Sequence, residues 1–203
     1  MSGIVAIDLT KMWSVEAGLR PVTFTVEAGE LVVVRGRSGS GKSTLLALVA
    51  GLCAPDVGTI TVEGVVPSVD MPWASVAFVP QALALAVELS VHENISDAAP
   101  LASDAHLHEM MERLDLHEFA HRCIDEISMG QQQRAAVARA CGAQPHVLLV
   151  DEPTSFQDGH HAAAVISELT RLAGDGAAVL VATHDDAVVR AADRTLELAD
   201  DLL

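Results

Sequence analysis

Three stretches of the chain are apolar without interruption. They cover residues 31–34, 147–150 and 177–182 and consist only of valine, leucine and alanine. A strand that is covered on both faces has this appearance, because neither of its faces meets water. The three stretches therefore predict strands of a buried, parallel central sheet.

A fourth stretch, residues 22–26, alternates apolar and polar positions. Its sequence, Val-Thr-Phe-Thr-Val, has the period of two that is typical of a half-buried strand. Residues 28–30, Ala-Gly-Glu, follow it and have the composition of a turn. We expect this segment to be an antiparallel strand.

Apolar residues recur at helical spacing between the strands. One predicted helix has Ser103 as a candidate N-cap and an apolar face made of Leu107, Met110, Met111 and Leu114. Another has an apolar face made of Val165, Leu169 and Leu172 and ends near Gly174. Strands that alternate with helices indicate an α/β fold.

The length of 203 residues indicates a single domain over residues 1–203. Residues 87–139 carry no strand signal and lie between two regions that do. We therefore predict that they form a helical lobe inserted into the sheet domain. Residues 1–86 and 140–203 would form the core around the sheet.

The composition limits the class of function. Twelve Lys and Arg against 28 Asp and Glu give a net charge of −16, which disfavours binding to a nucleic-acid backbone. No apolar run reaches the roughly 18 residues of a membrane-spanning helix, and the first residues lack the basic region of a signal peptide. We expect a soluble, cytoplasmic protein whose Cys53, Cys123 and Cys141 are reduced and buried.

Residues 36–43 match the pattern GxxxxGK(S/T) of a phosphate-binding loop. The loop follows the apolar stretch 31–34 and precedes a helix-like segment that begins at Thr44. Its glycines let backbone N–H groups turn towards phosphate oxygens, and the helix N-terminus adds the positive end of a dipole. Lys42 would supply a point charge, and the Ser43 hydroxyl would ligate Mg²⁺. An ordinary glycine-rich turn would not explain the agreement of strand, lysine and helix.

An acidic pair directly follows the apolar stretch 147–150. Asp151 is expected to hold Mg²⁺ through water, as the second half of a nucleotide site requires. Glu152 comes one residue later and is expected to act on an attacking water molecule. Without the phosphate loop, such a pair would more simply be the solvated start of a loop.

Residues 127–134 narrow the class of nucleotide-binding protein. Their sequence, Ile-Ser-Met-Gly-Gln-Gln-Gln-Arg, is similar to the LSGGQ signature with its polar and basic tail. With the phosphate loop, this segment makes the chain resemble the ATP-binding subunit of an ABC transporter. The resemblance implies a P-loop NTPase-type fold: a mainly parallel sheet flanked by helices, a small antiparallel β subdomain and the inserted helical lobe.

The resemblance also implies roles for residues in family order. Glu152, His184 and Gln81 would be catalytic, and Ser43, Gln81 and Asp151 would hold Mg²⁺. The residues expected to bind ATP are Trp13, which would stack on adenine, the loop residues Gly36, Arg37, Ser38, Gly39, Ser40, Gly41, Lys42, Ser43 and Thr44, and Ser128, Gly130, Gln131 and Asp158.

The implied partners are a second copy of the chain and a membrane protein. In the family mechanism two subunits dimerise head to tail, and each ATP lies between one subunit's phosphate loop and the other's signature. The family also implies a separately encoded permease, which would hold the protein at the cytoplasmic face of a membrane. Met129 stands in place of the signature's first glycine, and Phe156 and Gln157 replace the usual Ala-Leu before Asp158, so we expect the subunit packing to differ there.

Two alternatives compete with a transporter subunit. An ABC-type ATPase of DNA repair or translation would need a long insertion or a basic patch, yet Ser128 lies only 86 positions after Lys42 and the chain is acidic. A zinc metallopeptidase would use residues 117–121, which match HExxH. We expect these histidines to lie instead on a polar face of the helical lobe.

Overall fold

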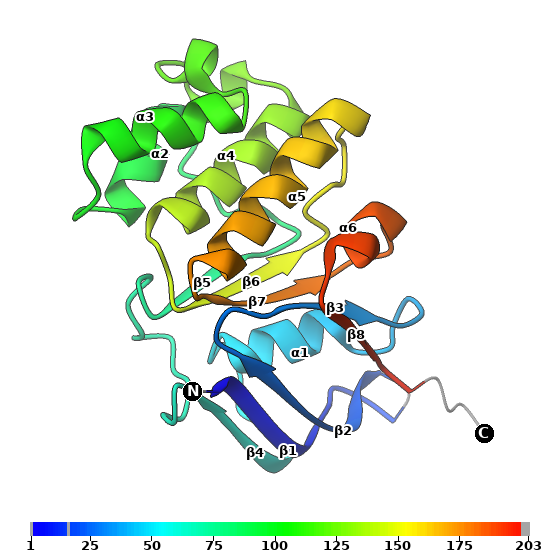
Figure 1. Ribbon diagram of the computed structural model, residues 1–203. Coiled ribbons are helices and arrows are strands. Elements are labelled where there is room, and N and C mark those ends of the chain that lie inside the picture. The colour runs from blue at the N-terminus through cyan, green and yellow to red at the C-terminus, as the bar shows by residue number, and fades with distance from the viewer. Residues whose placement is uncertain (1, 16, 200–203) are drawn as a thin grey trace.

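The computed structural model describes residues 2–15 and 17–199, so the outer bounds of the predicted domain, Met1 and Leu203, lie outside the described residues. A five-stranded parallel sheet crosses the middle of the molecule (Figure 1). Its strands lie in the order β5 (Val76–Val79), β6 (Val147–Asp151), β7 (Ala178–Ala182), β3 (Leu31–Arg35) and β8 (Arg194–Glu197). The three apolar stretches form β3, β6 and β7, which confirms the predicted parallel strands.

A second sheet is antiparallel and lies at the bottom of Figure 1. It has the order β2 (Gly18–Glu27), β1 (Ser2–Met12) and β4 (Val57–Val62). In β2 the side chains of Phe24 and Val26 are buried, whereas Thr23 and Thr25 are exposed. The period-two pattern therefore predicted both the strand and its buried side.

The parallel sheet separates two apolar cores, to which β3, β6 and β7 each contribute alternate residues. On one face, Val33, Leu148 and Val181 pack against the helices drawn above the sheet in Figure 1. On the other face, Val32, Leu149 and Leu180 pack with helix α1 (Lys42–Val49) and the antiparallel sheet. Both faces are thus desolvated, which is why these strands contain no polar position before their ends.

Helices cover the first face of the sheet. They are α2 (Val91–Ala98), α3 (Asp104–Arg113), α4 (Met129–Gly142), α5 (Gly159–Gly174) and α6 (Asp186–Ala191), with the short 3₁₀ helices η1 (His117–Phe119) and η2 (Ile124–Glu126). Ser103 caps α3 by accepting the N–H of His106, as predicted. Cys141 is buried, but Cys53 and Cys123 are partly exposed, so the expectation that all three are buried was wrong. None of the helices in the described part of the chain has the length and hydrophobicity of a membrane span.

One buried carboxylate joins helix α3 to helix α5. The Glu168 side chain is 1% exposed and accepts hydrogen bonds from Arg113 Nε at 2.9 Å and from Arg171 at 2.7 Å. Burial raises the pKa of this carboxyl, but the hydrogen bonds from Arg171 and Arg113 outweigh burial and leave the pKa below its ordinary value. Since α3 lies in the predicted lobe and α5 in the core, the ion pair ties these two parts together.

Glu168→Gln should lower the free energy of unfolding by about 2 kcal/mol, because two partly exposed guanidinium groups lose their charged hydrogen-bond acceptor. The lowered pKa means that the contribution is complete above the ordinary glutamate pKa of 4.5 and is lost as the pH falls through the lowered value. Urea denaturation at neutral and acidic pH should therefore show a difference between parent and variant that shrinks on acidification. Asp175→Asn is the control, because its exposed pair with Arg171 should contribute less than about 1 kcal/mol.

Candidate functional site

The predicted phosphate loop lies between β3 and α1. Lys42 Nζ donates hydrogen bonds to the carbonyl oxygens of Gly36 at 2.7 Å and Arg37 at 3.1 Å, so the ammonium is held over the loop. Gly41 has φ of 95° at the start of α1, and a Cβ there would lie 2.7 Å from the carbonyl oxygen of Gly18. This loop shape therefore needs a glycine. The arrangement presents one cation and a helix N-terminus to an anion.

The neighbouring strand β6 brings a carboxylate to the loop. Asp151 is buried, and its Oδ2 accepts a hydrogen bond from the Ser43 hydroxyl at 2.7 Å. A carboxylate beside a hydroxyl is an oxygen donor set of the kind that Mg²⁺ prefers, completed by water and phosphate oxygens. The two residues therefore fit the magnesium role that the sequence predicts for them.

Glu152 is held in a fixed orientation at the end of β6. Its backbone has φ of 50°, a left-handed conformation that costs free energy for a residue with a side chain. Its Oε2 accepts hydrogen bonds from the Thr183 hydroxyl at 2.9 Å and from the N–H of His184 at 3.4 Å. His184 Nε2 lies 3.8 Å from Oε1 of Glu152. Thr183 is buried and was not predicted; its position just before His184 is the only sequence signal for it.

A cavity of about 410 Å³ collects most of these groups. Its lining includes Trp13, Ser38, Gly39, Gly41, Lys42, Ser43, Thr44, Gln81, Asp151, Glu152 and His184. The Trp13 side chain is 59% exposed, and its Nε1 donates a hydrogen bond to Thr44 Oγ1 at 3.1 Å. Lys11 Nζ lies over the ring at 5.1 Å from its centroid, and the exposure of the indole leaves ring surface for stacking.

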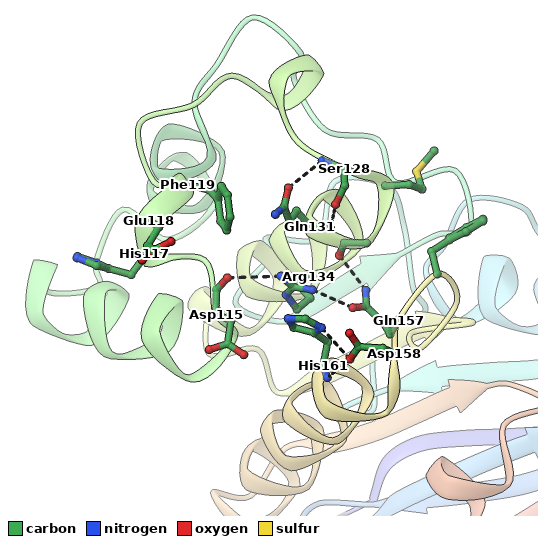
Figure 2. Close-up of a pocket in the computed structure, with 13 residues that line it drawn as sticks. Asp115, His117, Glu118, Phe119, Ser128, Gln131, Arg134, Gln157, Asp158 and His161 are labelled. Carbon is green, nitrogen blue, oxygen red and sulfur yellow. Dashed lines mark hydrogen bonds and ion pairs between the residues drawn. The ribbon is translucent and has the colours of Figure 1, made fainter.

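The signature residues lie in another cavity, of about 560 Å³ (Figure 2). It is lined by Ser128, Gly130, Gln131 and Asp158 among others, and in the described part of the chain it shares no lining residue with the first cavity. Ser128 caps α4 by accepting the N–H of Gln131, and Gln131 Oε1 accepts the N–H of Ser128 at 2.8 Å. Gly36, Arg37 and Ser40 belong to the phosphate loop but line neither cavity.

Asp158 begins helix α5 as its N-cap. Its carboxylate accepts the N–H of His161 at 3.0 Å and lies 2.8 Å from Nδ1 of the same side chain. The hydrogen bond from the His161 backbone holds the pKa of Asp158 below its ordinary value. This acid is therefore charged and fixed at the signature cavity, next to Gln157 (Figure 2).

The polar tail of the signature contains three residues with structural contacts that the sequence did not reveal. Gln132 Nε2 donates to the carbonyl oxygens of Ile124 and Ile127, which fixes the approach to the signature. Gln133 is buried and donates to the carbonyl oxygen of Glu152 at 3.4 Å. Arg134 is also buried and donates to the Leu114 carbonyl oxygen at 2.7 Å. The only sequence signal for these contacts was the run of glutamines before Arg134.

Residues 117–121 do not form the helix that a zinc peptidase needs. That motif places two histidines on one face of an α-helix, whereas only residues 117–119 are helical here, as the 3₁₀ helix η1. The ring of His117 packs edge-on against His108, with ring centroids 4.5 Å apart. Among the residues that the structure describes, no group of three or more His, Cys, Asp and Glu side chains is arranged to hold a metal ion.

Comparison with known proteins identifies the family to which the chain belongs. The family model of ABC transporters matches residues 19–155, which is more than half of the chain. The chain belongs to the ABC transporter family. Membership of this family makes it an ATP-binding and ATP-hydrolysing cassette, as its phosphate loop and signature predicted.

Individual relatives agree with the ABC assignment. PvdT of Pseudomonas aeruginosa, a pyoverdine export ATP-binding/permease protein, is 35% identical over 90% of this chain, which spans only 29% of PvdT. YtrE of Bacillus subtilis, an ABC transporter ATP-binding protein, is 33% identical over 91% of this chain and 86% of its own length. The dimeric cassette MJ0796, solved in a post-hydrolysis state with ADP and Pi, has a TM-score of 0.86 at 28% identity, covering 97% of this chain and 94% of that one.

His117→Ala should leave the ATPase rate within a few-fold of the parent: His117 lines the signature cavity, but its ring points away from Ser128 and Gln131 (Figure 2) and packs against His108. Elemental analysis of the purified parent should show no stoichiometric zinc. Tightly bound zinc that is lost in the His117→Ala variant would contradict this assignment and support a metal site at the HExxH match.

Proposed function

We propose that this cassette couples ATP hydrolysis to transport through a membrane permease. The observation that carries the proposal is the separation of the ATP-binding residues into two cavities within one chain. Each chain would hold half of a site, and a second copy would supply the other half. We further propose that residues 87–139 act as a lobe that carries the signature, on a core made of residues 1–86 and 140–203.

The phosphate-loop cavity would bind the nucleotide. Lys42 would exchange its carbonyl partners for the outer phosphate oxygens, while loop N–H groups and the N-terminus of α1 bind the same charge. Trp13 would stack on the adenine. Ser43, Asp151 and Gln81 would hold Mg²⁺, which neutralises charge on the phosphates during transfer. The close approach of Ser43 to Asp151 supports this assignment.

Glu152 would orient and polarise the attacking water. Thr183 and the N–H of His184 occupy Oε2 of the carboxylate, so Oε1 remains on the side of the His184 imidazole. The imidazole would stabilise the γ-phosphate and the water, and Gln81 would sense the occupied site. Exclusion of water when the site closes would strengthen each of these interactions.

Closure would require a head-to-tail homodimer. The signature of one subunit, Ser128, Gly130 and Gln131, would face the γ-phosphate held by its partner, with the N-terminus of α4 directed at the anion. Asp158 would lie beside the same contact. The similarity to MJ0796, whose cassette structure is dimeric, supports this arrangement.

The permease is proposed from the relatives. PvdT is described as an ATP-binding/permease protein, and YtrE, which this chain matches over most of its length, as an ATP-binding protein of an ABC transporter. We propose that the chain works at the cytoplasmic face of a membrane, bound to a permease. Copurification with a membrane protein would support this role over that of a DNA-repair or translation ATPase, which the net charge of −16 also disfavours.

Glu152→Gln should keep ATP binding and lower the hydrolysis rate by about 10²-fold or more, because it removes the group that activates the nucleophile. ATP should then hold the variant as a dimer, which size-exclusion chromatography at fixed ATP can detect. Hydrolysis at the parental rate would show that Glu152 does not have this role.

Lys42→Ala and Ser128→Arg should each abolish activity for different reasons. Lys42→Ala removes a charge at the phosphates and weakens nucleotide binding, whereas Ser128→Arg leaves monomer binding intact and blocks closure. A mixture of the two inactive variants should regain ATPase activity, because one composite site of a mixed dimer receives both defects and the other receives neither.

Crosslinking gives an independent control for the mixing experiment. Ser128→Cys, paired with a cysteine near the partner's phosphate loop and combined with Glu152→Gln, should form an ATP-dependent crosslink. A protein that binds ATP, regains no activity on mixing and forms no crosslink would rule out the head-to-tail dimer.

A further inference from the structure

Gln157 forms a bridge between two segments that line the signature cavity: the loop before α5, which contains Gln157, and the start of α4. Its Nε2 donates to the carbonyl oxygen of Gly130, in the first turn of α4, at 2.8 Å. Its Oε1 accepts from Arg134, one turn further along the same helix, at 3.0 Å. Figure 2 shows the Gln157 amide between Arg134 and the first turn of α4, next to Asp158. Both ends of the amide are therefore used to fix one segment to the other.

Arg134 is a firm anchor for this bridge. Its side chain is buried and donates to the backbone carbonyl oxygens of Leu114 at 2.7 Å and Asp115 at 3.4 Å as well as to Gln157. Burial lowers the pKa of its guanidinium, which shows that the charge is partly desolvated. A buried guanidinium needs acceptors in fixed directions, and the Gln157 oxygen is one of them.

The backbones of the two segments also lie in close contact. A Cβ on Gly130 would lie 2.8 Å from the carbonyl oxygen of Phe156, so a side chain at position 130 would push the segments apart. Phe156 itself has φ of 64°, a left-handed conformation, and its side chain is 73% exposed. The N–H of Gln157 donates to the carbonyl oxygen of Thr154 within this turn, and the side-chain bridge from Gln157 adds polar contacts from the turn to α4.

We propose that Gln157 is a positioning residue that holds the signature and Asp158 as one rigid unit for docking onto a second copy. The inference rests on the proposed head-to-tail dimer, in which Ser128, Gly130 and Asp158 all meet the partner. A leucine, which the resemblance to the family leads us to expect before the acid, has no polar side-chain atoms and cannot make either bond. In this protein the amide therefore fixes the distance between two parts of the docking surface.

Two substitutions separate positioning from stability. Gln157→Leu keeps the approximate side-chain volume and removes both hydrogen bonds. Gln157→Glu keeps an acceptor for Arg134 and gives it a counter-ion, but it loses the N–H and places a carboxylate against the Gly130 carbonyl oxygen. Each variant is made in the parent and in the Glu152→Gln background. Thermal unfolding, ATP binding to the monomer and ATP-dependent dimerisation are measured for all of them.

Both variants should need about tenfold more protein than the parent to form half of the ATP-dependent dimer in the Glu152→Gln background, by sedimentation velocity. At low protein concentration their ATPase rates should fall accordingly and recover in part as the protein concentration is raised. ATP affinity of the monomer should stay within about twofold of the parent, because the phosphate-loop cavity contains no part of the bridge. Gln157→Glu should unfold near the parental temperature, because the new counter-ion of Arg134 offsets the lost bond to Gly130, although it dimerises poorly.

Three outcomes would overturn the inference. Dimerisation of both variants at parental concentrations would show that Gln157 has no positioning role. Full recovery of dimerisation in Gln157→Glu alone would show that the Arg134 bond suffices and that the Gly130 bond does not matter. Loss of ATP binding by the Gln157→Glu monomer would indicate a general structural role. A Glu152→Gln parent that fails to dimerise with ATP would contradict the proposed dimer itself, which is a distinct result.

Discussion

The burial of the parallel sheet on both faces is the constraint on which the site depends. Strands β3, β6 and β7 contribute alternate residues to two apolar cores, so no polar side chain can be placed within them without a partner. Polar chemistry can appear only where the strands end. The phosphate loop follows β3, the acidic pair ends β6, and Thr183 follows β7, so parallel order brings all three to one edge of the sheet.

Helix α4 connects this edge to the signature while keeping the two cavities apart. Gln133 reaches the carbonyl oxygen of Glu152 from the first part of the helix, and Ser128 caps its N-terminus in the other cavity. A change at the signature can therefore act on the backbone beside Glu152, although none of the described residues lines both cavities. This geometry favours a mechanism in which the second copy, rather than a movement within one chain, completes the site.

The sequence predicted what depends on local pattern and missed what depends on distant partners. Uninterrupted apolar runs located three strands, and the fixed spacing of the phosphate loop located its lysine and hydroxyl. Strand β1 was not delimited, because register shifts against β2 break its alternation. The Glu168 ion pair with Arg113 joins residues 55 positions apart, so no periodicity could reveal it. In the sequence, the residues before Asp158 were visible only as a departure from the family pattern. The bridge could not be predicted, because it joins Gln157 to Gly130, which lies 27 positions earlier.

The charge of the chain explains why positioning matters for the proposed dimer. Two copies with a net charge of −16 repel each other, and bound ATP adds negative charge at the contact. Salt screens this repulsion beyond about 8 Å, but not between groups that meet across a closed site. Arg37 and Lys42 bring two cations to the phosphate loop, but Lys42 is one of only two lysines and Arg134 is buried beneath the signature, so the cations at the contact are few against a net charge of −16. Attraction has to come from oriented short-range groups: the phosphate loop, the N-termini of α1 and α4, and the hydrogen bonds that they direct at phosphate. Such bonds weaken steeply with misalignment. A protein with this charge therefore depends on a rigid docking surface more than one whose partners attract each other from a distance.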